Sequence, residues 1–214
     1  MAKASVSEFF NTYSHDFNAI YGNENTPFNR LINGLFRESM RLRYAKSLEG
    51  CEPIEGRTVL DVGCGPGHYS VALATKGAGR VLGIDFARGM IELAQRHARR
   101  ACVGDKCEFM TADFMSYPFP EPFDYSIVMG LMDYVADPRP VVERVLSLTR
   151  SKAFFSFPLE GGVLGWQRKL RYRDRCDLFM YNEDQVRKLF VGTRCQNVQV
   201  ERISRDFFVT AVIS

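Results

Sequence analysis

The feature that most constrains the fold of this chain is a glycine-rich segment between a strand pattern and a helix pattern. Residues 59–67 read VLDVGCGPG, so an apolar run with one acid leads into glycines at alternate positions. Such a strand–loop–helix unit lets a nucleotide-like ligand lie close against the backbone. We therefore expect Gly63, Gly65 and Gly67 to contact a cofactor.

The details of this loop distinguish between two kinds of cofactor. A dinucleotide-binding loop has the spacing G-x-G-x-x-G. Here the third glycine comes one residue early, and His68 stands where the last glycine of that pattern would be. Asp61 lies at the mouth of the loop, where its charge opposes a pyrophosphate and favours a cation. These departures favour a cationic cofactor, with a nicotinamide-dependent oxidoreductase as the less favoured alternative.

Three later strand patterns end in residues suited to the same ligand. The run at 80–84 ends in Asp85, which can accept hydrogen bonds from ribose hydroxyls, and Phe86 can lie on an adenine face. The runs at 107–111 and 123–130 follow in order. Four elements in this order are much more specific than one glycine loop.

With these motifs, the chain resembles the class I S-adenosylmethionine-dependent methyltransferases. The resemblance implies S-adenosylmethionine as cofactor, with S-adenosylhomocysteine as product. The positively charged sulfonium and ammonium groups of this cofactor suit the negative charge of Asp61. It also places Asp113 and Phe114 near the adenine and Met129 at the methyl-transfer site. In many related enzymes an N-terminal helix closes over the cofactor, so Tyr13 and Tyr21 are candidates for the methionine end.

The remaining pattern predicts an α/β fold with a doubly wound, mostly parallel sheet, because strands and helices alternate. Two consecutive terminal strands should form a hairpin, so the last strand is antiparallel. The resemblance implies seven strands and a Rossmann-like architecture. Helices are expected at 7–21, 27–49, 68–76, 87–100, 139–149 and 183–190, and the last three strands at 153–157, 198–203 and 206–213.

We expect a single domain, 1–214, with four parts. Residues 1–50 form a helical cap, 57–158 the cofactor-binding core, 159–181 a substrate lid, and 182–214 the C-terminal helix and hairpin. The lid follows a strand, which places it at the ligand-binding edge of the sheet. It carries the only tryptophan and five basic residues, namely Trp166, Arg168, Lys169, Arg171, Arg173 and Arg175. This run either attracts an anionic acceptor or is a solvated face.

Composition and charge limit the cellular compartments and the binding partners to be expected of this chain. The net charge is +3, which does not by itself imply nucleic acid. The N-terminus has no apolar signal region, and no stretch approaches the length needed to span a bilayer. The six cysteines contain no C-x-x-C pair, which argues against a metal site and disulfides and favours reduced thiols in the cytoplasm. Peripheral membrane contact is a less favoured alternative.

The sequence shows no nucleophile–base–orienter set, and the expected chemistry requires none, because the sulfonium is already a good leaving group. We expect methyl transfer to a small molecule, with an anionic oxygen such as a carboxylate or phenolate as acceptor. Nitrogen and carbon acceptors, and a non-catalytic cofactor-binding scaffold, stay open. Arg41 and Arg43 are interpreted as a solvated face, with pairing to the cofactor carboxylate as the alternative.

Overall fold

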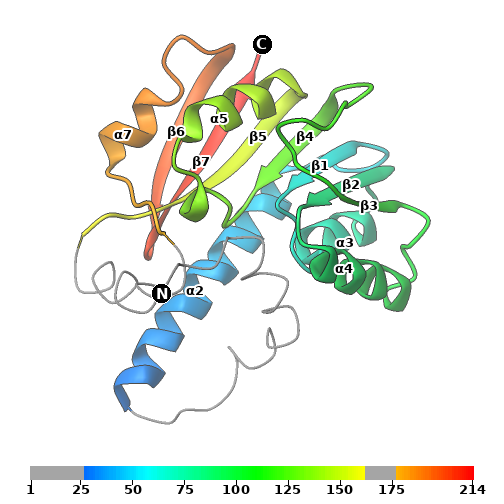
Figure 1. The fold of residues 1–214 in the computed structure, drawn as a ribbon, viewed down its shortest axis with the longest axis horizontal. Coiled ribbons are helices and arrows are strands. Elements are labelled where there is room, and N and C mark those ends of the chain that lie inside the picture. The colour runs from blue at the N-terminus through cyan, green and yellow to red at the C-terminus, as the bar shows by residue number, and fades with distance from the viewer. Residues whose placement is uncertain (1–26, 162–176) are drawn as a thin grey trace.

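The computed structural model describes residues 27–161 and 177–214. Helices and strands alternate along most of this length (Figure 1). The elements are α2 (Pro27–Gly50), β1 (Thr58–Val62), α3 (His68–Thr75), β2 (Arg80–Asp85), α4 (Arg88–Arg100), β3 (Cys107–Thr111), β4 (Phe123–Val128), the short 3-10 helix η2 (Met132–Tyr134), α5 (Pro138–Ser147), β5 (Thr149–Pro158), α7 (Glu183–Lys188), β6 (Cys195–Ile203) and β7 (Asp206–Ile213).

The strands form one seven-stranded sheet in the order β3-β2-β1-β4-β5-β7-β6. The first five strands pair in parallel, and β7 is antiparallel to both of its neighbours. Val59 lies beside Val81 on one side and Tyr125 on the other, so the carboxyl ends of β1, β2 and β4 share one edge. The predicted doubly wound sheet and terminal hairpin are confirmed.

Both faces of the central strands β1 and β4 are buried, which explains their continuous apolar runs. Successive residues of a strand point to opposite faces. Leu60 accordingly belongs to the core beneath α5 and α7, whereas Val59 belongs to the core beneath α3 and α4. The C-terminal part of α2 packs beside α3 and reaches β5, β6 and β7 (Figure 1).

Several element boundaries differ from the predictions: α7 ends at Lys188 rather than at 190, and β6 begins at Cys195 rather than at 198. The expected helix at 139–149 is α5, which begins at Pro138 and ends at Ser147. Asp137 caps it by accepting a hydrogen bond from the Arg139 amide, with proline at the first helical position. Thr149 already belongs to β5, where it pairs with Phe123, so β5 is longer than the expected 153–157.

Several predictions lie outside the described residues. These are the helix at 7–21 with Tyr13 and Tyr21, and the basic run around Trp166. The two ends of the predicted lid are described, and they are joined: the Glu160 amide donates to the Tyr181 carbonyl at 2.8 Å. Along the described residues, no helix is both long and apolar enough to cross a bilayer.

Candidate cofactor site

The glycine loop leaves β1 in a conformation that only glycine adopts easily. Gly65 and Gly67 have φ values of 51° and 77°. A Cβ on Gly67 would lie 2.8 Å from the Cβ of Ala94 on α4, so this glycine lets the loop pack on the helix. A Cβ on Gly65 would meet nothing within 4 Å. The loop is therefore closed toward α4 and open at Gly65, where a ligand can approach the backbone.

Asp85 holds this loop at the end of β2. One of its carboxylate oxygens accepts from the Gly65 amide at 3.0 Å and the other from the Ala87 amide at 2.8 Å. Burial raises the pKa of Asp85, and the backbone hydrogen bonds oppose that rise. The Phe86 amide is a further backbone donor to this carboxylate. A carboxylate offers about four lone-pair sites, so Asp85 can still accept from a hydroxyl group. Phe86 follows directly and is 36% exposed, so its ring is available to a flat ligand.

Asp61 is more deeply enclosed than its predicted role suggests. It is buried, and it accepts a hydrogen bond from the Ser70 hydroxyl of α3 at 2.6 Å. Burial raises the pKa of Asp61 to about 7, against the lowering effect of Ser70. Its carboxyl group thus fastens β1 to α3. Its contact with a cationic cofactor stays a prediction.

The residues that follow β3 and β4 occupy three different surroundings. Asp113 is exposed and accepts from the Met115 amide at 3.0 Å. Phe114 is buried in the core, where the Arg144 guanidinium lies 5.5 Å from its ring centroid. Met129 is half-buried at the end of β4. All three lie at the predicted edge, and their contacts with a cofactor stay predictions.

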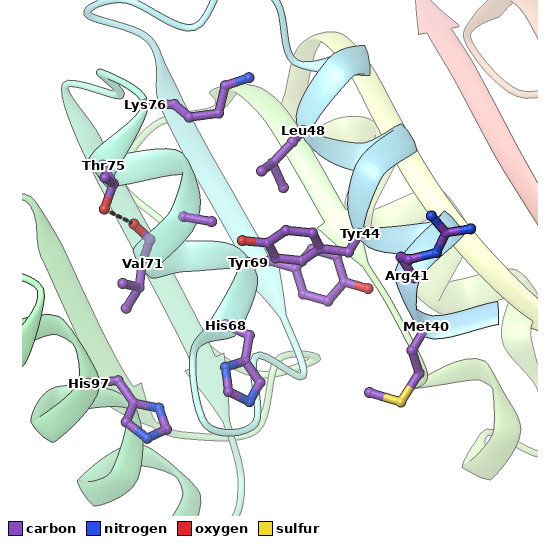
Figure 2. A pocket seen from close by; sticks show the side chains of 11 residues that line it. Met40, Arg41, Tyr44, Leu48, His68, Tyr69, Val71, Thr75, Lys76 and His97 are labelled. Carbon is purple, nitrogen blue, oxygen red and sulfur yellow. Dashed lines mark hydrogen bonds between the residues drawn. The ribbon is translucent and has the colours of Figure 1, made fainter. Parts of the chain in front are cut away.

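A groove of about 690 Å³ lies between α2 and α3, next to His68, the residue that follows the glycine loop (Figure 2). Tyr44 and Tyr69 meet in it with ring centroids 5.6 Å apart. At its loop end, His97 Nδ1 lies 2.8 Å from the Pro66 carbonyl oxygen, and the His97 ring stacks on His68. Burial is the main cause that lowers the pKa of His68. Among the described residues, none of the predicted cofactor contacts lines this groove.

Arg43 is the residue that sequence reasoning placed wrongly. Instead of belonging to a solvated face, it is only 8% exposed, and it donates from Nη1 to the Ser156 hydroxyl at 3.2 Å. Its Nε lies 3.6 Å from Asp206 Oδ2. Ser39 and Ser47 share its helix face at four-residue spacing and are also buried. This row of polar residues was a signal in the sequence that Arg43 is buried, but its partners lie on distant strands.

The fold and the site together define a class of protein. A doubly wound sheet, a glycine loop after β1 and an acid at the end of β2 are typical of a Rossmann-like domain that binds a nucleotide-containing cofactor. Among the described residues, no group of three or more His, Cys, Asp or Glu side chains could hold a metal ion.

Comparison with known proteins narrows this class. Residues 59–152 match the family described as "Methyltransferase domain". Curated relatives include the ubiquinone biosynthesis O-methyltransferases of Paracidovorax citrulli, 35% identical over 51% of this chain and 46% of that protein, and of Neisseria meningitidis, 34% identical over 55% of this chain and 49% of that protein. The chain thus spans about half the length of the curated relatives it matches.

A solved structure shares the fold over almost the whole chain. Magnesium protoporphyrin IX methyltransferase from Synechocystis, with bound S-adenosylhomocysteine, has a TM-score of 0.77 at 21% identity and covers 98% of each chain. The family match over residues 59–152 and this shared fold support a class I, S-adenosylmethionine-dependent methyltransferase. The resemblance drawn from the motifs is confirmed.

Proposed function

We propose that this chain transfers the methyl group of S-adenosylmethionine to an oxygen atom of a small molecule. The observation that carries the proposal is the hydrogen bond from the Gly65 amide to Asp85, beside the open space next to Gly65. The match to the methyltransferase family and the relatives named O-methyltransferases support it. The acceptor oxygen forms a bond to the methyl carbon, the carbon–sulfur bond breaks, and S-adenosylhomocysteine leaves.

The cofactor would lie across the carboxyl ends of β1, β2 and β4. Asp85 would accept from the ribose hydroxyls, as acids at the end of the second strand do in such folds. Phe86 would cover one adenine face and Asp113 would meet the adenine amino group. Gly63 and Gly65 would let the methionine end approach the backbone. The sulfonium and ammonium would lie on the side of the loop nearest Asp61.

Catalysis in this proposal is mainly alignment. The sulfonium leaves readily, so holding the acceptor oxygen in line with the methyl carbon supplies most of the rate. An acceptor that arrives as a carboxylate or phenolate needs no base, whereas a neutral hydroxyl would have to lose its proton to water or to a side chain. We therefore propose an anionic or aromatic oxygen acceptor as the substrate class.

Calorimetric titration with S-adenosylmethionine, S-adenosylhomocysteine and NADH tests the cofactor directly. We expect dissociation constants on the order of micromolar for the first two and no heat for NADH. Binding of NADH alone would support the oxidoreductase instead. Formation of S-adenosylhomocysteine with phenolic or carboxylic acids then tests turnover, and tight cofactor binding without product from any acceptor would favour a scaffold.

An Asp85→Ala variant tests the residue assignment. It removes the ribose acceptor and the hydrogen bond from the Gly65 amide, so affinity for S-adenosylhomocysteine should fall by about tenfold or more. The matched control is Asp105→Ala, which removes an exposed acid before β3. An unchanged affinity in Asp85→Ala would show that the ribose assignment is wrong.

A further inference from the structure

A cluster of buried polar side chains joins α2 to the far half of the sheet. Arg43 of α2 donates to Ser156 of β5 and lies beside Asp206 of β7, and the Ser39 hydroxyl also donates to Asp206. Ser39, Ser156 and Asp206 are each at most 2% exposed. The cluster therefore fixes where α2 lies against β5 and β7.

The same cluster reaches the predicted methyl-transfer edge through one backbone amide. The Gly130 N–H, just beyond the end of β4, donates to Ser156 Oγ at 2.8 Å. Ser156 thus accepts from Arg43 on one side and from Gly130 on the other. A Cβ on Gly130 would lie 3.8 Å from Arg43 Nη1, so the guanidinium approaches this turn closely.

The turn at Gly130 in turn touches the glycine loop. A Cβ placed on Gly63 would lie 3.4 Å from Leu131 Cβ, which is ordinary contact distance. Gly130 has a φ of 76°, a left-handed conformation that glycine adopts without steric cost. A shift of Gly130 would therefore change the spacing between Leu131 and Gly63.

The energetics point away from a purely stabilising role for Arg43. Its buried Nε has no hydrogen-bond partner among the residues that the structure describes, and it lies 3.6 Å from the Asp206 carboxylate. A buried ion pair with imperfect hydrogen bonding is often no more stabilising than apolar side chains of the same volume. What the cluster does supply is direction, because the Arg43 guanidinium holds the Ser156 hydroxyl that accepts from the Gly130 amide.

We propose that Arg43 and Ser156 are positioning residues that lock the turn 129–131 to α2. The Ser156 hydroxyl accepts from Arg43 of α2 and from the Gly130 amide, so the position of α2 and the geometry of the methyl-transfer edge are coupled. The inference rests on the proposed function for its consequence in cofactor binding. The lock itself is a property of the fold and is tested separately.

Amide hydrogen exchange at Gly130 measures the lock without any ligand. Ser156→Ala removes the acceptor, and the double variant Arg43→Met/Asp206→Asn removes both charges of the ion pair that holds α2 to β7. We expect Gly130 exchange to accelerate by at least about tenfold in both variants. The matched control is Ser126→Ala, because Ser126 is also buried in β4 and shares a 2.7 Å hydrogen bond with Thr149. Its Gly130 exchange should equal that of the wild type.

Calorimetry with S-adenosylhomocysteine measures the consequence. Affinity should fall by about tenfold in Ser156→Ala and in the double variant, and by less than about twofold in Ser126→Ala. Gly130 protection that survives in the double variant would overturn the proposal, as would an equal affinity loss in Ser126→Ala. A wild-type chain that does not bind S-adenosylhomocysteine would contradict the proposed function, while the exchange data would still decide the lock.

Discussion

The two halves of the sheet build their polar contacts in different ways. In the half formed by β1, β2 and β3, the glycine loop is held by the Gly65 amide, which donates to Asp85 at the end of the next strand. In the half formed by β5, β6 and β7, buried side chains of Arg43, Ser156 and Asp206 come together from distant segments. The first half is thus organised locally, and the second only when the chain has folded.

This difference determines how each half should respond to mutation. A carboxylate that accepts backbone amides at a partly open edge can be replaced by water when it is removed. A buried charge that loses its partner has no such replacement, and its desolvation penalty is left uncompensated. The largest effects on stability should therefore come from the half that carries no recognisable motif.

Asp206→Ala should have the largest effect, because it removes the carboxylate that lies 3.6 Å from Nε of the buried Arg43 guanidinium. We expect a loss of about 3–5 kcal/mol in the free energy of unfolding, measured with urea. The addition of Arg43→Met should recover much of that loss, since both charges are then absent. If the double variant were no more stable than Asp206→Ala, the ion pair would not be the cause.

Asp61 offers the contrasting case in the glycine-loop half, a buried carboxyl group that accepts from the Ser70 hydroxyl. Its pKa is raised from 3.8 to about 7 by burial, so the native state holds this proton more tightly than the unfolded chain does. Between those two values the unfolded chain binds fewer protons, and stability must fall as pH rises. The contribution is of the order of 2–4 kcal/mol across that window.

The variant Asp61→Asn should abolish this dependence while still accepting from Ser70. Urea unfolding at pH 4.5, 6 and 8 gives the comparison, and the difference between variant and wild type isolates Asp61 from other titrating groups. We expect the free energy of unfolding of the variant to increase steadily, relative to that of the wild type, as the pH rises. Parallel profiles would mean that Asp61 stays ionised, or that water reaches it.

Gly67→Ala tests the close packing of the loop on α4. The added Cβ would meet Ala94 at 2.8 Å in a left-handed backbone conformation. The conformation costs about 1–2 kcal/mol and the overlap at least about 1 more, so a loss of about 2–3 kcal/mol is expected. Gly56→Ala is the control, since Gly56 has a φ of 69° but open space around it. An equal loss in both variants would attribute the effect to backbone conformation alone.

The local organisation of the first half explains why the sequence could predict it. The loop, Asp85 and the bounds of β3 and β7 follow from residues adjacent in the chain, and the structure has them where expected. The burial of Arg43 could not be found this way, because Ser156 and Asp206 lie more than a hundred positions away. An arginine in a helix is exposed unless a distant segment covers it.

The smallest effect should come from an exposed ion pair in the glycine-loop half, which isolates burial as the variable in the comparison. Arg80 of β2 and Glu108 of β3 approach to 2.9 Å, but their side chains are 40% and 47% exposed. Solvent screens such a pair, so Glu108→Gln should change the free energy of unfolding by less than about 0.5 kcal/mol, and added salt should reduce even that. Urea unfolding at low and high salt provides the measurement. A loss similar to that of Asp206→Ala would mean that ion-pair chemistry, rather than burial, separates the two halves.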